Sequence, residues 1–124
     1  MHVVDSSGWI EFFVGGHNAG LFDAKIQDHQ NLLVPTIVLH EVGRFLIRKG
    51  GRDAALEATL QMQRGLVVDL DASIAFLAAR LGIRYQLPSA DSIVYATAQS
   101  HSATLWTQDD DFQKLPGVRY IRKR

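Results

Sequence analysis

The sequence predicts an α/β protein, a three-layer α/β/α sandwich around a mainly parallel sheet of four to five strands. Short unbroken apolar runs alternate with helical segments along the 124 residues, a pattern typical of strands that are covered on both faces. The composition is 47% hydrophobic, which suits one domain over residues 1–124 with its own core. There is no cysteine, so disulfides and thiolate metal sites are excluded.

The first half of the chain predicts two strands and the helices that follow them. Residues 2–5 form a short apolar run that ends in Asp-Ser-Ser, a polar cap before a short helix. Gly15 and Gly16 end that helix, and residues 18–29 favour a second one. The run LLVP at residues 32–35 predicts the next strand, with Pro35 in the first turn of a helix that continues to Lys49.

The second half of the chain continues the alternation. The segments at 53–64, 71–84 and 89–101 have helical composition. Between them, LVVDL at residues 66–70 predicts the third strand, and ATLW at 103–106 predicts the fourth. VRYI at residues 118–121 is a candidate for a short fifth strand.

Charge and hydropathy set limits on partners and location. Thirteen basic and thirteen acidic residues cancel, so net charge gives no argument for a polyanionic partner. Two basic clusters, at 44–52 and 119–124, fit solvated faces and also permit a phosphate-binding rim. The chain has neither a basic leader before an apolar run nor a stretch near the ~18 apolar residues of a membrane span. We therefore expect a soluble, cytoplasmic protein that does not contact membranes.

Several acids fall where a parallel sheet binds its ligands, beyond the carboxyl ends of strands. Asp5 ends the first strand, Asp91 begins the helix after Pro88, and Asp109 follows the fourth strand. Each also has an ordinary explanation. Asp5 can cap a helix, Asp91 can lie in a first turn that Ser89 caps, and the run at 109–111 can form a turn.

Glu41 is harder to explain as a surface residue. On a helical projection it borders the face predicted to be buried, which consists of Val38, Leu39, Val42, Phe45 and Leu46. A carboxylate at that border loses hydration unless it is neutralised, paired or bound to a cation. Pairing with Arg44 or Arg48, or a side chain that bends out to water, remains open as an alternative.

Electrostatics favours a cation if these acids meet. Two carboxylates about 4 Å apart repel by about 4 kcal/mol at the effective dielectric of a protein surface, and a divalent ion offsets this repulsion. Oxygen donors without cysteine or a close histidine pair select Mg²⁺ or Mn²⁺ over zinc. No glycine-rich phosphate loop is present, so nucleotide-binding chemistry of that kind is unsupported.

Four segments together resemble the PIN domain family, specifically the toxin ribonucleases of VapBC-type toxin–antitoxin pairs. They are VVDSSGWIEFF, VPTIVLHEVGRFL, LPSADSIVYATA and LWTQDDDF, and the resemblance covers nearly the whole chain. The last segment is similar to the Thr-x-Asp-x-Asp-Phe pattern of the family, with Thr107, Asp109, Asp111 and Phe112 in register. Because Asp110 makes a run of three acids, the fourth ligand is open among them; Asp109 is favoured, with Asp111 as a helper or turn cap.

The resemblance implies metal-dependent hydrolysis of single-stranded RNA that leaves a 5′-phosphate. Asp5, Glu41, Asp91 and Asp109 would be the catalytic acids, and with Asp111 they would hold one or two Mg²⁺ or Mn²⁺ ions. Hydroxyls at Ser6 and Thr107 could orient the acids. Arg44 and Arg48 are candidates for contact with the RNA backbone.

The same resemblance implies two protein partners, a VapB-type antitoxin that lies across the acid site and a second copy of the chain in a homodimer. Aromatic residues near the N-terminus fit either such a contact surface or the core: Trp9, Phe12, Phe13 and Phe22.

Two other functions remain open. A receiver domain of a signalling system has a similar alternation and strand-end acids, and would accept a phosphoryl group on Asp69 or Asp71. Receiver domains have a pair of adjacent acids after the first strand and a lysine after the last central strand. This chain has Asp-Ser-Ser and Thr-Gln-Asp at those places. A PIN-like module that only binds RNA or protein is the second alternative, and the presence of all the matched acids argues against it.

Overall fold

A computed structural model describes residues 1–124 and shows one five-stranded sheet, in which every neighbouring pair of strands is parallel. The strand order across the sheet is β3-β2-β1-β4-β5. The strands are β1 (His2–Val4), β2 (Leu32–Pro35), β3 (Leu66–Val68), β4 (Thr104–Thr107) and β5 (Val118–Tyr120). The predicted α/β class with a parallel sheet is confirmed.

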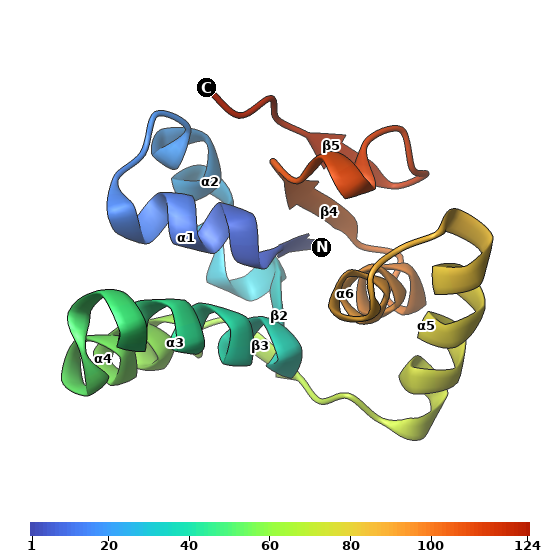
Figure 1. Cartoon of the computed structure of the whole chain (residues 1–124), viewed down its shortest axis with the longest axis horizontal. Helices are drawn as coiled ribbons and strands as arrows, with labels where there is room; N and C mark the ends of the chain where they lie inside the picture. Colours follow the sequence, from blue (N-terminus) through green and yellow to red (C-terminus); the bar gives the residue numbers. More distant parts are fainter.

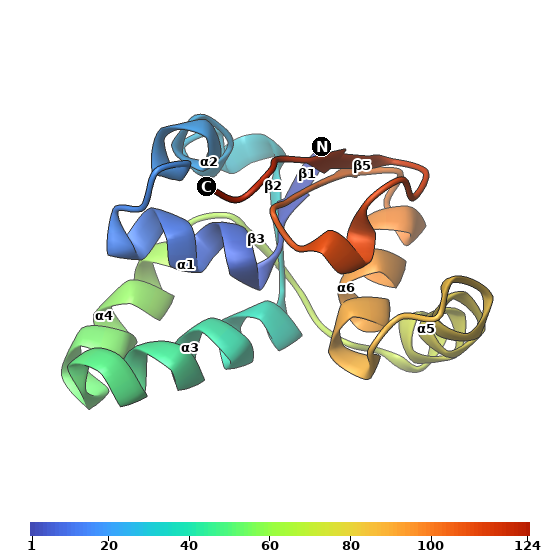
Figure 2. The same ribbon diagram turned by 45° about the horizontal axis from the view of Figure 1, so that its top comes forward.

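The helices form two groups on either side of the central strands, α1 to α4 on one side and α5 and α6 on the other (Figures 1 and 2). Their bounds are α1 (Ser6–Val14), α2 (Ala19–Ile26), α3 (Thr36–Gly50), α4 (Arg52–Met62), α5 (Ala72–Tyr85) and α6 (Ser89–Ser100). The two groups meet where α3 contacts α6. None of these helices is both long and apolar enough to cross a membrane.

Some element boundaries differ from those expected. The predicted helix over 18–29 ends at Ile26, and a separate 3-10 turn covers His29–Asn31. The third strand stops at Val68 because its only neighbour, β2, ends opposite it at Pro35. Pro35 is thus the last strand residue and precedes α3 instead of lying in its first turn. A second 3-10 turn, Asp110–Phe112, links β4 to β5.

The core forms around β1 and β2, which are buried along their whole length, whereas the edge strand β3 is largely exposed. Trp9 and Phe22 belong to this core, with 1% and 0% of their surfaces exposed, so they are not available as a contact surface. Phe12 and Phe13 are half-buried and pack against Trp9.

The buried face of α3 is narrower than its sequence pattern predicts. Only Val38 and Val42 are fully buried, whereas Leu39, Phe45 and Leu46 are half-buried. Of these three, Leu39 and Leu46 still pack against the core, and Phe45 does not.

The strand order places its reversal at β1. The chain adds β2 and β3 on one side of β1 and then returns to add β4 and β5 on the other side. The carboxyl ends of β1 and β4 therefore flank the switch point, where open parallel sheets bind ligands. Asp5 and Asp109 follow these two strands directly or within two residues.

Candidate metal centre

Three carboxylates converge at the switch point. One oxygen from each of Asp91, Asp109 and Asp111 lies within 4.8 Å of the others. Asp91 comes from the first turn of α6, and the other two come from the 3-10 turn after β4 and the residue that caps it. Segments distant in the sequence thus supply three oxygen donors to one place.

Asp5 is buried beside this group, with 3% of its surface exposed. Its Oδ1 accepts from the Ser7 hydroxyl at 2.7 Å and from the Gly8 backbone N–H at 3.0 Å, so it does cap α1. Its Oδ2 accepts from the Thr107 hydroxyl at 2.7 Å. Burial dominates over these hydrogen bonds and, with a smaller contribution from the negative charge of Asp109, raises the pKa of Asp5 to about 6.

Glu41 reaches the same region from α3, and its Oε1 is buried without any hydrogen-bond partner. Burial raises the pKa of Glu41, the Ser6 hydroxyl and the nearby His40 lower it, and Asp109 raises it. Neither Arg44 nor Arg48 forms an ion pair or a hydrogen bond with Glu41, and both are exposed. The alternative in which an arginine of its own helix neutralises Glu41 is therefore wrong.

Asp91 shows the strongest effect of crowding. Burial, and then the negative charges of Asp109, Asp111 and Asp5, together raise its pKa to about 7. Asp109 also acts on the pKa values of Asp5 and Glu41, which makes it the common neighbour of the acids. Asp109 and Asp111 both face Asp91, so the structure brings both alternatives for the last position into one cluster.

Two hydroxyl side chains connect the ends of β1 and β4. The Thr107 hydroxyl donates to Asp5 and accepts from the Asp109 backbone N–H at 2.9 Å. The Ser7 hydroxyl donates to Asp5 and accepts from the Gln108 backbone N–H at 3.2 Å. Sequence reasoning named Thr107 and Ser6 but missed Ser7, whereas Ser6 lies beside Glu41.

The three consecutive acids have different surroundings. Asp109 accepts from the Asp111 backbone N–H at 2.9 Å and so caps the 3-10 turn, a role expected for Asp111. Asp110 is exposed and accepts a hydrogen bond from the Tyr120 hydroxyl on β5. Tyr120 was not singled out from the sequence, because its contact with Asp110 depends on the pairing of β4 with β5.

The donor set fits a hard divalent cation. Mg²⁺ and Mn²⁺ take carboxylate oxygens, and every acid in the cluster offers such atoms. The unpartnered, buried Oε1 of Glu41 supports the same conclusion, because an acceptor of this kind is unfavourable unless a cation or donor meets it.

The PIN domain family profile matches residues 2–118. The chain belongs to the PIN domain family. No curated protein matches its sequence.

Solved structures share this PIN fold at low sequence identity. A toxin–antitoxin complex from Klebsiella pneumoniae is 24% identical with a TM-score of 0.80, covering 98% of this chain and 100% of that one. A sarcin-ricin loop cleaving VapC toxin from Mycobacterium tuberculosis is 20% identical with a TM-score of 0.77, covering 99% and 100%. A VapBC complex from Rickettsia felis, bound to promoter DNA, is 13% identical with a TM-score of 0.75, covering 99% and 98%. These likenesses establish the fold.

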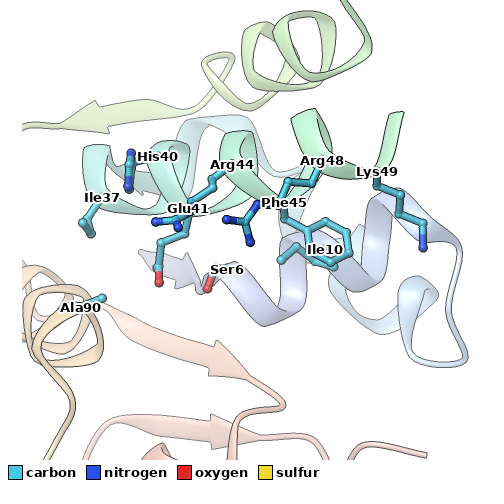
Figure 3. Close-up of a pocket in the computed structure, with 10 residues that line it drawn as sticks. All are labelled: Ser6, Ile10, Ile37, His40, Glu41, Arg44, Phe45, Arg48, Lys49 and Ala90. Atoms are coloured by element: carbon cyan, nitrogen blue, oxygen red, sulfur yellow. The ribbon is translucent and has the colours of Figure 1, made fainter. Parts of the chain in front are cut away.

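A groove of this PIN domain runs along α3 beside Glu41. It has a volume of about 790 Å³, and its lining includes Glu41, Arg44, Phe45, Arg48, Lys49 and Ala90. Figure 3 shows the Glu41 carboxylate pointing from α3 toward the side that Ala90 of α6 closes. We call this space the α3 groove. Of the acids at the site, only Glu41 lines this groove, and basic side chains line it farther along α3.

Proposed function

We propose that this protein is a divalent-metal-dependent endoribonuclease and the toxin of a VapBC-type toxin–antitoxin pair. The observation that carries the proposal is the convergence of Asp91, Asp109 and Asp111 at the switch point of a PIN fold. The similarity to toxin–antitoxin structures supports it at the level of the fold.

Each acid has a defined part in the proposal. Asp91, Asp109 and Asp111 would hold Mg²⁺ or Mn²⁺, with Asp5 and Glu41 completing the set from β1 and α3. A divalent cation supplies a water of lowered pKa and offsets negative charge on the phosphate. Asp91, whose pKa is about 7 without a metal, would lose its proton as it binds the cation.

Thr107 and Ser7 would act as positioning residues. Both donate to Asp5, and each also accepts a backbone N–H from the segment that follows β4. These bonds hold the end of β1 against the start of the acidic turn. Ser6 would orient Glu41 in the same way.

Arg44 and Arg48 would contact the RNA backbone, since both line the groove that starts at Glu41 and both are exposed. A VapB-type antitoxin and a second copy of the chain are proposed partners. Exposed apolar side chains are available for such contacts, among them Leu56, Leu60 and Leu66.

The experiment uses end-labelled transfer RNA and messenger RNA with Mn²⁺, Mg²⁺ or EDTA, and compares the unaltered protein with Asp91→Asn. We expect cleavage only with a divalent ion, products with a 5′-phosphate, and no cleavage by Asp91→Asn. A 2′,3′-cyclic phosphate would contradict the mechanism, because it requires attack by the neighbouring hydroxyl. Equal cleavage in EDTA would contradict the metal requirement.

The non-catalytic alternative is tested by the same assay. If the chain only binds RNA or protein, the unaltered protein and Asp5→Asn will show the same background cleavage. Membership of the PIN domain family argues against the receiver-domain alternative. Asp71, a candidate phosphoacceptor in that alternative, is exposed and caps α5.

A further inference from the structure

Phe45 is an aromatic residue that the core does not use. It is half-buried on α3, lines the α3 groove, and packs against neither of the two hydrophobic clusters. The Lys49 ammonium lies 5.7 Å from the centre of its ring. The ring therefore borders a space rather than the interior, with a cation at one side (Figure 3).

Basic residues flank Phe45 along the same stripe of the helix. Arg44, Arg48 and Lys49 all line the α3 groove. Because α3 rises 1.5 Å per residue, Arg48 lies roughly 10 Å along the axis from Glu41. A chain with regularly spaced negative charges could therefore follow α3 from the acids to these cations.

The charges in the groove favour nucleic acid. Three of its ten lining residues are arginine or lysine, and Glu41 is the only acid among them, which suits a ligand that carries a row of phosphates. Cations beside an exposed aromatic ring are the usual means of binding single strands, in which bases stack on rings and phosphates meet basic side chains. A paired base cannot stack in this way, because its faces are already covered.

We propose that the α3 groove is a subsite for an unpaired nucleotide, in which Phe45 stacks on the base while Arg48 and Lys49 contact the adjoining phosphate. The inference rests on the proposed function and deepens it. The groove selects single-stranded RNA next to the bond that is cleaved. Arg44, nearest the acids, contacts the phosphate on the cleavage side of that base.

The test measures binding by fluorescence anisotropy in an Asp91→Asn background, so that the RNA stays intact. The probes are a short, unstructured, labelled RNA and the same sequence annealed into a duplex. Phe45→Leu removes the ring but keeps apolar volume, and we expect it to weaken binding of the single strand about 5- to 20-fold with little effect on the duplex. Phe45→Trp restores a ring and should restore the affinity, which separates lost stacking from a damaged fold.

Matched controls lie outside the groove. Phe76→Leu removes an aromatic side chain that is 70% exposed on α5, and Arg80→Gln removes an exposed cation from the same helix. Both should bind the single strand like the parent. Arg48→Gln should weaken binding and reduce its dependence on salt concentration.

Three results would overturn the subsite. Phe45→Leu could bind the single strand as tightly as the parent. It could lose affinity for the duplex by the same factor as for the single strand. It could also bind RNA normally but no longer capture a co-expressed antitoxin. The last result would assign the groove to a protein. Failure of the proposed function is separate, since it appears as absence of Mn²⁺-dependent cleavage by the unaltered protein, while the binding comparison in the Asp91→Asn background still decides the subsite.

Discussion

Asp5 and Asp71 occupy equivalent local positions in two regions with different surroundings. Each follows a strand and caps a helix, through the Gly8 N–H at 3.0 Å and the Ile74 N–H at 2.8 Å respectively. Asp71 is exposed at the edge of the sheet, after β3. Asp5 is buried at the switch point, beside Asp109. Capping geometry alone therefore does not distinguish the two acids; convergence with other acids does.

Burial shows what the two positions require of the protein. An exposed cap such as Asp71 stabilises its helix by about 1 kcal/mol and keeps its hydration. Asp5 accepts three hydrogen bonds and still has a pKa raised to about 6, because burial disfavours its charge more than the bonds favour it. A site that maximised stability would not place a carboxylate there.

The comparison predicts its largest effect in catalysis. Asp5→Asn should lower Mn²⁺-dependent RNA cleavage by more than about 100-fold, because changes at outer partners of a metal site already reduce metal affinity 10- to 100-fold. Asparagine keeps the shape and can still accept from Gly8. Initial rates on labelled RNA measure the loss.

Asp71→Asn is the matched control for this change, and its rate should stay within about twofold of the unaltered protein because asparagine also caps helices well. Equal losses in the two variants would mean that the chemistry does not depend on the position of Asp5.

The next effect is the dependence of stability on pH without metal. Folding raises the pKa of Asp5 from 3.8 to about 6 and that of Asp91 from 3.8 to about 7. The folded state therefore binds protons more tightly, and these two groups lower the free energy of unfolding as pH rises from about 4 to 7. For Asp5 the upper limit is about 3 kcal/mol.

Urea unfolding in EDTA at several pH values measures this effect. In Asp5→Asn the free energy of unfolding should fall less steeply as pH rises, so this variant should be more stable than the unaltered protein at pH values above about 7. With saturating Mn²⁺ the trend should reverse, because ionised carboxylates bind the cation and protonated ones do not. Parallel curves for both proteins in EDTA would contradict the assignment.

A smaller effect is expected at Thr107, which has no exposed surface and connects Asp5 to the Asp109 backbone. Thr107→Val keeps the shape but removes the hydrogen bonds of the hydroxyl, including the third one to Ser7, so Mn²⁺ affinity should fall about 10- to 100-fold. Thr59→Val is a suitable control, since the Thr59 hydroxyl donates only to Leu56 O on α4. If both variants bind Mn²⁺ equally well, Thr107 does not position the acids.

The smallest effect belongs to the bond between Tyr120 and Asp110 at the rim. Tyr120→Phe and Asp110→Asn should each reduce Mn²⁺ affinity by less than about tenfold, because the bond is exposed and acts only through the turn that carries Asp109 and Asp111. A double-mutant cycle in Mn²⁺ affinity measures the coupling of the pair. A loss as large as that of Asp91→Asn would make Asp110 a ligand instead.

Much of the fold was predictable because the central strands are continuous apolar runs ended by residues with clear roles. Val3 and Val4 precede a capping Asp5, and Leu32 to Pro35 end at a proline. The strand-end rule then located the acids. The strand order, which puts β1 beside β4, is a long-range property that no local pattern contains.

Side-chain directions were harder to predict. Ser7 rather than Ser6 contacts Asp5, because that choice depends on how α1 is set against β1. The setting requires Gly8, where an added Cβ would lie 2.6 Å from Val4 Cγ1. Phe45 fits the apolar stripe of α3, yet it borders a groove. Helical periodicity gives the direction of a side chain but not whether another element covers it.

Calorimetric titration of the protein with Mn²⁺ in two buffers of different ionisation enthalpy, at pH 6 and at pH 8, tests the central claim most directly. Asp5 and Asp91, with pKa values of about 6 and about 7, should release protons when the ion binds at pH 6 and almost none at pH 8. Asp91→Asn should bind far more weakly. Absence of Mn²⁺ binding by the unaltered protein, or equal binding by Asp91→Asn, would contradict the assignment of these acids to a metal centre.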